Sequence, residues 1–141
     1  MTSEARLREL DIELPGLGTS RYTYVPFRRA GDIVFLAGQV PRLPDGSYLT
    51  GKVGSDRTVE EGREAARLCG LHMLASARAV TGSLDEVEFL KVFGMVNAAP
   101  DFRDHGLVME GSPSFWSRSS ANGGSMLARR LAWDHSRPTS G

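Results

Sequence analysis

This sequence of 141 residues lacks the features that mark several special classes of protein. It has one cysteine, Cys69, which excludes a disulfide-stabilised scaffold and a cysteine-based zinc site. Its 17 Lys and Arg residues balance 17 Asp and Glu residues, so no sequence-wide field attracts nucleic acid or an anionic membrane. The longest apolar run, Ile33 to Ala37, is far too short to span a bilayer.

The N-terminus also lacks the apolar core of a signal peptide, because residues 1–16 carry charges every few positions. The hydrophobic content of 40% is enough to build one core in a chain of this length. The sequence therefore predicts a small, soluble, cytoplasmic domain without a membrane segment.

The even charge balance hides a change of composition near Gly111 and Ser112. Residues 1–111 hold 13 basic and 16 acidic side chains, whereas residues 112–141 hold four arginines and one aspartate. The second segment also has eight serines and no Val, Ile, Tyr or Lys. Such a composition is typical of a disordered or linker segment, yet this one contains both tryptophans of the chain.

The first half of the chain contains two strand patterns. Tyr22 to Phe27 is aromatic and β-branched, although Pro26 weakens the pattern. Arg29 to Asp32 is a plausible hairpin turn. Asp32 to Val40 is nearly continuously apolar, which predicts a buried central strand.

The strongest local pattern predicts a helix from Val59 to about Val80. Thr58 and Glu61 have the spacing of a capping box, and Gly82 is a suitable C-terminal stop. One face of this helix carries small or flexible residues, which would let it approach a sheet closely: Gly62, Ala66, Cys69, Met73 and Ala77.

The region after this helix predicts one more strand, within Asp85 to Val96, and a further turn or second helix beginning at Asp101 and Phe102. The order of these elements favours an α+β fold, with helices on one face of a sheet.

Few side chains form an obvious chemical site. His72 could be a general base, but a partly buried structural histidine is about three times as common at such a place. His105 and His135 lack partners at metal-binding spacings, so we expect no protein-built metal site. Cys69 has no basic neighbour to activate it, which favours a role in core packing.

Four segments resemble the reactive-intermediate deaminase superfamily, the RidA/YjgF-type proteins, also described as endoribonuclease L-PSP-like. The resemblance is closest to a less-characterised RidA-like subgroup with a Gly-Lys-Val-Gly loop. The segments are VPFRRAGDIVFLAGQVP (25–41), TGKVG (50–54), TVEEGREAARLCGLHML (58–74) and GMVNAAPDF (94–102).

This resemblance implies a chorismate-mutase-like α+β domain that forms a homotrimer, with small-ligand clefts between subunits. It implies hydrolysis of reactive enamines and imines to 2-keto acids and ammonia, without a metal or organic cofactor. A non-catalytic, ligand-binding trimer is the alternative. A nucleic-acid or ribonuclease role is disfavoured by the acidic balance of residues 1–111.

The family pattern implies three substrate-binding residues. Tyr24 falls at the position of a cleft tyrosine, and Gly38 with Gln39 matches the strand end that borders the cleft. Ala37 stands where the deaminases usually have a serine. The arginine that would bind the substrate carboxylate is expected beyond residue 111, but Arg118 comes too early and no strand-like segment follows it.

A shifted reading frame explains the unusual C-terminal segment. When residues 112–141 are back-translated with GC-rich codons and read two bases along, they give AELLVEVFGERGKHARSALGVGSLPANVR. This sequence supplies, in family order, an amphipathic helix, the missing Arg-Ser pair and a turn into a strand. We therefore divide the chain into an incomplete RidA-like domain, residues 1–111, and an out-of-frame tail, residues 112–141.

This division predicts a missing or extra base in the codons around Gly111 and Ser112. Sequencing the gene across these codons checks the prediction directly. An intact frame through this position, with no base missing or added, would show that the tail is a natural divergent sequence.

Overall fold

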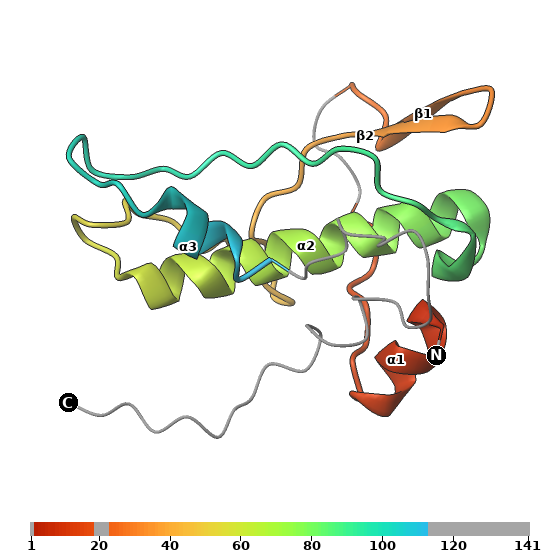
Figure 1. Ribbon diagram of the computed structural model, residues 1–141, viewed down its shortest axis with the longest axis horizontal. Coiled ribbons are helices and arrows are strands. Elements are labelled where there is room, and N and C mark those ends of the chain that lie inside the picture. The colour runs from red at the N-terminus through yellow and green to blue at the C-terminus, as the bar shows by residue number, and fades with distance from the viewer. Residues whose placement is uncertain (1, 19–22, 113–141) are drawn as a thin grey trace, which may run out of the picture.

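A long helix, α2 (Val59–Thr81), runs along the structure, and the shorter helices lie beside it (Figure 1). The structure is a computed structural model that describes residues 2–18 and 23–112. Apart from Ser112, the expected tail of residues 112–141 lies outside these described residues.

The ends of α2 are those that the sequence predicts. Thr58 Oγ1 accepts a hydrogen bond from the backbone N–H of Glu61 at 3.1 Å, and the Glu61 carboxylate accepts one from the backbone N–H of Thr58 at 2.8 Å. The helix stops at Gly82, whose φ of 84° is left-handed. Because glycine has no Cβ, it adopts this conformation at little cost.

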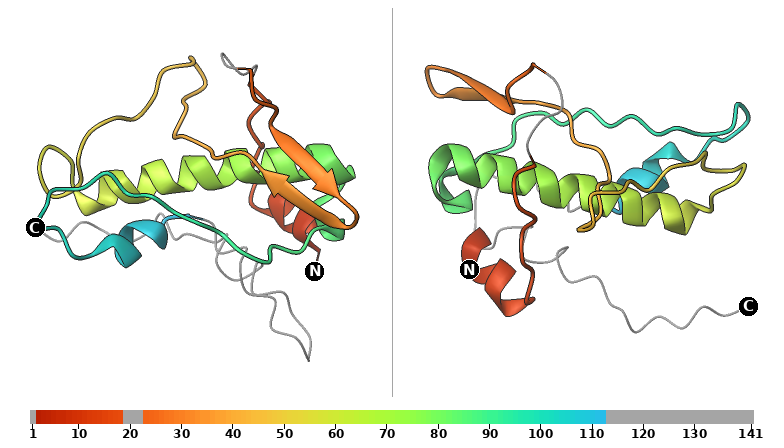
Figure 2. Two further views of the ribbon diagram at one scale, coloured as in Figure 1. Left: turned by 90° about the horizontal axis from the view of Figure 1, so that it is seen from above. Right: turned by 180° about the vertical axis from the view of Figure 1, so that it is seen from behind.

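The main hydrophobic core lies at the C-terminal half of α2. There the short helices α1 (Ser3–Glu9) and η1 (Leu84–Glu86) meet α2, and α1 lies on the side of α2 opposite the hairpin (Figure 2). The buried cluster consists of Leu7, Leu71, Leu74, Ala77 and Leu84.

Polar interactions of Glu4 join the N-terminal helix to α2 and η1 beside this core. The Glu4 carboxylate accepts hydrogen bonds from the Arg78 guanidinium and, at 3.0 Å, from the backbone N–H of Leu84. These donors and the positive charge of Arg78 outweigh desolvation and lower the pKa of Glu4. The N-terminal helix is therefore held against α2 by both apolar and charged contacts.

The N-terminal half of α2 packs against a second, smaller group of residues. The short helix α3 (His105–Met109) and the loop around Val53 both approach α2 at Gly62. A Cβ added at Gly62 would lie 2.8 Å from Val53 Cγ2 and 3.2 Å from Val108 Cγ1. The predicted small-residue face of this helix therefore does permit close contact at Gly62, although with a loop and a helix rather than with a sheet.

The sheet is an antiparallel hairpin of β1 (Phe27–Ala30) and β2 (Ile33–Leu36). The expected turn is confirmed, because Gly31, with a φ of 59°, and Asp32 connect the strands. The expected strand at 22–27 is shifted toward the C-terminus and begins at Phe27. Pro26 explains this start, since proline has no N–H to donate to the ladder.

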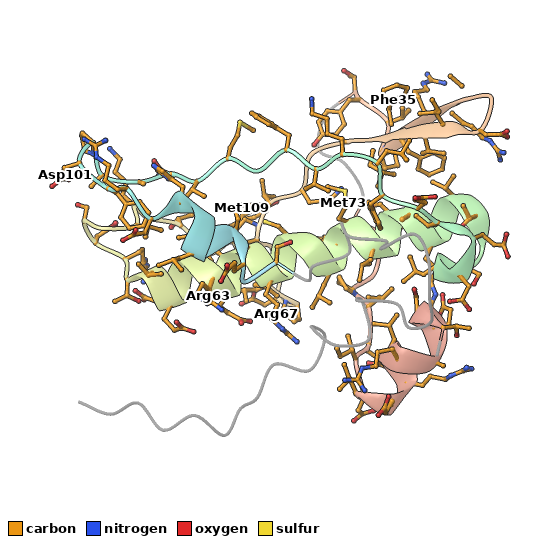
Figure 3. The ribbon with its side chains drawn as sticks, viewed as in Figure 1. Phe35, Arg63, Arg67, Met73, Asp101 and Met109 are labelled. Carbon is orange, nitrogen blue, oxygen red and sulfur yellow. The ribbon has the colours of Figure 1, made fainter. Side chains whose placement is uncertain are left out.

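The expectation that Asp32 to Val40 forms a buried central strand is wrong. Strand β2 covers only Ile33–Leu36, and Phe35 is 66% exposed. In Figure 3, Phe35 lies on the hairpin, away from α2. A strand is buried only when other elements cover both of its faces, and within the described residues β2 pairs with β1 alone.

The strand expected within Asp85 to Val96 is also absent from the described part of the chain. This segment begins with η1 and then runs extended along α2 without pairing into a sheet (Figures 1 and 2). Pairing occurs only beyond its end, where Ala98 forms an isolated parallel bridge with Val53. Three of its apolar side chains are largely exposed: Leu90, Phe93 and Met95.

The α+β class predicted from the sequence is confirmed by this combination of helices and a small antiparallel sheet. The turn expected at Asp101 and Phe102 is present, and α3 follows it. Of the helices that the structure describes, none has both the length and the apolar character of a membrane span.

The close approach at Gly62 predicts opposite effects for two glycine-to-alanine changes. Gly62→Ala should lower the free energy of unfolding by about 1–3 kcal/mol, because the new methyl group overlaps Val53. Gly106→Ala, in open space on α3, should raise it by up to about 1 kcal/mol through helix propensity. Urea denaturation of the two variants measures both effects, and equal effects would contradict the close contact.

Candidate functional site

The hairpin brings the three candidate binding residues to one end of the sheet. The register pairs Phe27 with Leu36, and one further hydrogen bond joins Ala37 N to Pro26 O at 2.8 Å. Pro26 and Ala37 are therefore the outermost bonded residues at this end of the hairpin. Tyr24 comes two residues before Pro26, and Gly38 and Gln39 come directly after Ala37. All three residues leave the sheet at the same open end.

Two of these residues face solvent. Tyr24 is 56% exposed, and Gly38 is exposed as well. A Cβ added at Gly38 would meet no atom within 4 Å. The strand end therefore carries an exposed tyrosine and an open stretch of main chain.

The Gln39 side chain is turned toward α2 instead. Its Nε2 donates to Ala37 O at 3.2 Å and to Ser76 Oγ at 3.4 Å. A carbonyl oxygen can only accept a hydrogen bond, so the atom that faces it is the amide nitrogen. Sequence reasoning missed Ser76, and the only available signal was its spacing of four residues from His72 on one helix face.

His72 also contacts the segment that follows Gln39. It is 7% exposed, and its Nε2 lies 3.0 Å from the carbonyl oxygen of Arg42. Because that oxygen can only accept, Nε2 carries the hydrogen and donates it. This burial and hydrogen bond fit the structural role that the sequence favours for His72.

Two residues close to this strand end bear on which polar groups a ligand could meet there. Ala37 supplies no hydroxyl group, and the Arg42 guanidinium donates to Gly16 O at 3.1 Å. The position expected for a carboxylate-binding arginine, and Arg118 itself, lie outside the described residues.

Other polar clusters of the described chain serve structural roles. Arg63 binds Leu107 O at 3.0 Å and so ties α3 to α2. Figure 3 shows Arg63 and Arg67 projecting from the same side of α2, where Arg67 lies 3.5 Å from Glu64. His105 lies edge-on to the Phe102 ring. Across residues 2–18 and 23–112, no three His, Cys, Asp or Glu residues come together as a metal site.

Burial raises the pKa of the Cys69 thiol to about 11. A thiol with this pKa is almost entirely protonated near neutral pH and is a poor nucleophile. This environment agrees with the role in core packing that the sequence favours.

Known proteins similar to this chain place it among the RidA/YjgF-type proteins. Protein TCP17 from Trypanosoma cruzi is 34% identical over 109 residues, which is 77% of this chain and 68% of TCP17. No family model matches the sequence.

Two crystal structures share the fold. A protein described only as a candidate endoribonuclease, from Shewanella oneidensis MR-1, superposes with a TM-score of 0.71 at 28% identity, over 82% of this chain and 77% of that protein. Atu1372 from Agrobacterium tumefaciens, of unknown function, gives a TM-score of 0.63 at 30% identity, over 81% of this chain and 71% of Atu1372.

The chain belongs to the RidA/YjgF-type superfamily. Membership confirms the resemblance that residues 25–102 carry. It also makes the open end of the hairpin the candidate ligand-binding region, because the RidA-type motif residues Gly38 and Gln39 follow the sheet there and Tyr24 precedes it on the other strand.

The raised pKa of Cys69 predicts slow alkylation. At pH 7.5 the shift from 9.0 to about 11 leaves about 100-fold less thiolate than in the unfolded chain. Iodoacetamide labelling with and without urea, followed by mass spectrometry, measures the ratio on the one cysteine of the chain. Equal rates in both states would contradict a buried thiol.

The raised pKa of Cys69 also predicts how its contribution to stability changes with pH. The unfolded chain loses its thiol proton first, so the contribution of Cys69 to stability falls as pH rises from about 9 toward 11. A Cys69→Ser variant should lack this part of the alkaline loss of stability.

Proposed function

We propose that this protein is a RidA-type enamine and imine hydrolase by descent, with activity weakened in this chain. In the proposed reaction, water adds to the C=N carbon of a 2-imino acid. The resulting carbinolamine then loses ammonia and leaves the 2-keto acid. The observation that carries the proposal is that Tyr24, Gly38 and Gln39 all lie just beyond the same end of the hairpin.

The proposed roles follow from the exposure of each residue. Tyr24 is largely exposed, and its phenol is a group of the kind that hydrogen-bonds the polar atoms of a small ligand. Gly38 leaves space for that ligand to approach the main chain. We assign no catalytic residue, and no metal or organic cofactor takes part in the proposed chemistry.

A homotrimer with the ligand cleft between subunits is part of this proposal. Its support is the exposure of large apolar side chains on one extended segment and on the hairpin, since exposed apolar surface is typical of interfaces. Their exposed fractions are 66% for Phe35, 76% for Leu90, 77% for Phe93 and 84% for Met95.

We further propose that residues 1–111 are the family domain without its C-terminal part. The carboxylate-binding arginine would then be encoded in the shifted frame, which is the reason for the weakened activity. Without that arginine, a 2-imino acid is held by hydrogen bonds alone and is poorly oriented for attack by water.

Restoring the in-frame sequence should therefore restore activity. We expect replacement of residues 112–141 by AELLVEVFGERGKHARSALGVGSLPANVR to raise ammonia release from enzymatically generated 2-aminoacrylate by about 100-fold. In the restored chain, Tyr24→Phe should lower the rate by about tenfold. Tyr48→Phe, at another exposed tyrosine, is the matched control and should leave the rate unchanged.

The alternative is a ligand-binding trimer without catalysis, which the alanine at position 37 favours. A restored chain that binds pyruvate but releases ammonia no faster than buffer would establish this alternative. Cleavage of RNA by the restored chain, lost with Tyr24→Phe, would overturn both readings in favour of a ribonuclease.

A further inference from the structure

Two polar residues on α2 are buried against the segment that carries the candidate site. Ser76 is 2% exposed and His72 is 7% exposed, and they are four residues apart. Residues with this spacing share one helix face. Burial of polar groups is costly unless they are hydrogen-bonded, so the partners of these two side chains define their role.

The hydrogen bonds of Ser76 are fully accounted for. Its hydroxyl donates to His72 O at 3.0 Å, so its lone pairs remain free to accept from Gln39 Nε2. The second hydrogen of that amide goes to Ala37 O. Both N–H bonds of Gln39 are therefore used within the protein, and its amide nitrogen has no hydrogen left for a ligand.

His72 holds the same segment three residues further on. Its Nε2 donates to Arg42 O, and the Arg42 guanidinium in turn donates to Gly16 O. The segment 37–42 is thus attached to α2 at two points, one through the Gln39 side chain and one through its own main chain. Between the sheet and the first of these points lies Gly38, which is exposed and has open space beside it.

We propose that Ser76 and His72 are positioning residues that hold segment 37–42 on α2, with Gln39 as an internal strut and Gly38 as the residue that faces the ligand. The ligand is then recognised at this strand end by main-chain groups, which suits a small 2-imino or 2-keto acid. Only this last point rests on the proposed function. The attachment to α2 is independent of it.

The first experiment uses the unaltered protein. Gln39 is the one glutamine in the sequence, so its side-chain NH₂ signals can be assigned without ambiguity by NMR. We expect these protons to exchange with solvent at least about fivefold more slowly than those of a free glutamine side chain. Exchange at the rate of a free glutamine side chain would contradict the proposed hydrogen bonds of the Gln39 amide.

Variants then test whether Ser76 and Gln39 protect segment 37–42 through the same interaction. Ser76→Ala should raise hydrogen exchange of the amides in 37–42 by about fivefold, and Gln39→Ala should do the same. The double variant should show no further increase, because both changes remove one interaction. Ser55→Ala, in an exposed loop, is the control that should leave this segment unchanged. Additive effects would overturn the proposal.

His72 is tested by conservative rescue. His72→Ala should increase exchange near Arg42, whereas His72→Gln keeps an N–H donor and should restore at least part of the protection. A thermal melt of each variant separates local loosening from loss of the fold. Equal exchange for the two substitutions would show that His72 only fills space.

The ligand arm uses pyruvate as the probe, titrated by NMR into the restored chain. Gly38→Ala should weaken pyruvate binding by at least tenfold. Gln39→Ala and Ser76→Ala should weaken it by the same factor as each other, and by a smaller factor than Gly38→Ala does. A Gln39→Ala effect well beyond that of Ser76→Ala would show direct contact and overturn the strut. If the restored chain binds no pyruvate, the proposed function fails while the exchange results still decide the positioning role.

Discussion

The rest of the structure depends on one constraint, which is that α2 must begin and end where it does. The reciprocal hydrogen bonds of Thr58 and Glu61 set its first turn, and Gly82 sets its last. The length of α2 between these two ends determines where the other elements can pack along it. The N-terminal helix and η1 cover one end, α3 and the Val53 loop cover the other, and segment 37–42 is attached between them.

This constraint explains which parts of the fold could be predicted from the sequence. A capping box and a C-terminal glycine act within a few residues, so the bounds of α2 can be read locally. The strands cannot be read in this way, because an apolar run forms a buried strand only if distant segments pair with it and cover it. Within the described chain, β2 pairs with β1 alone and residues 88–96 pair with no strand, although both sequences are apolar enough.

In the candidate site, too, some features follow from neighbouring residues in the sequence and others depend on distant ones. The motif around Gly38 and Gln39 can be recognised in the sequence, and the hairpin that brings Tyr24 to the same end of the sheet follows from a two-residue turn. The direction of the Gln39 side chain cannot be recognised, because it depends on Ser76, which lies 37 residues away. A motif therefore located the strand end, whereas only the three-dimensional structure distinguishes a strut from a ligand contact.

The chemistry available at this strand end bears on the proposal that residues 1–111 lack a charged group that catalysis needs. Main-chain groups at Gly38 and a phenol at Tyr24 can orient a small polar molecule through hydrogen bonds, but neither is a cation. A 2-imino acid carries a carboxylate, and a charge-assisted bond to arginine both binds it and fixes the C=N group for attack. Of the arginines on the neighbouring segment, Arg42 is already used to hold residue 16. Under the proposed function, the described residues therefore supply only uncharged groups to the ligand, and the arginine that binds the carboxylate belongs to the C-terminal sequence that the shifted frame encodes.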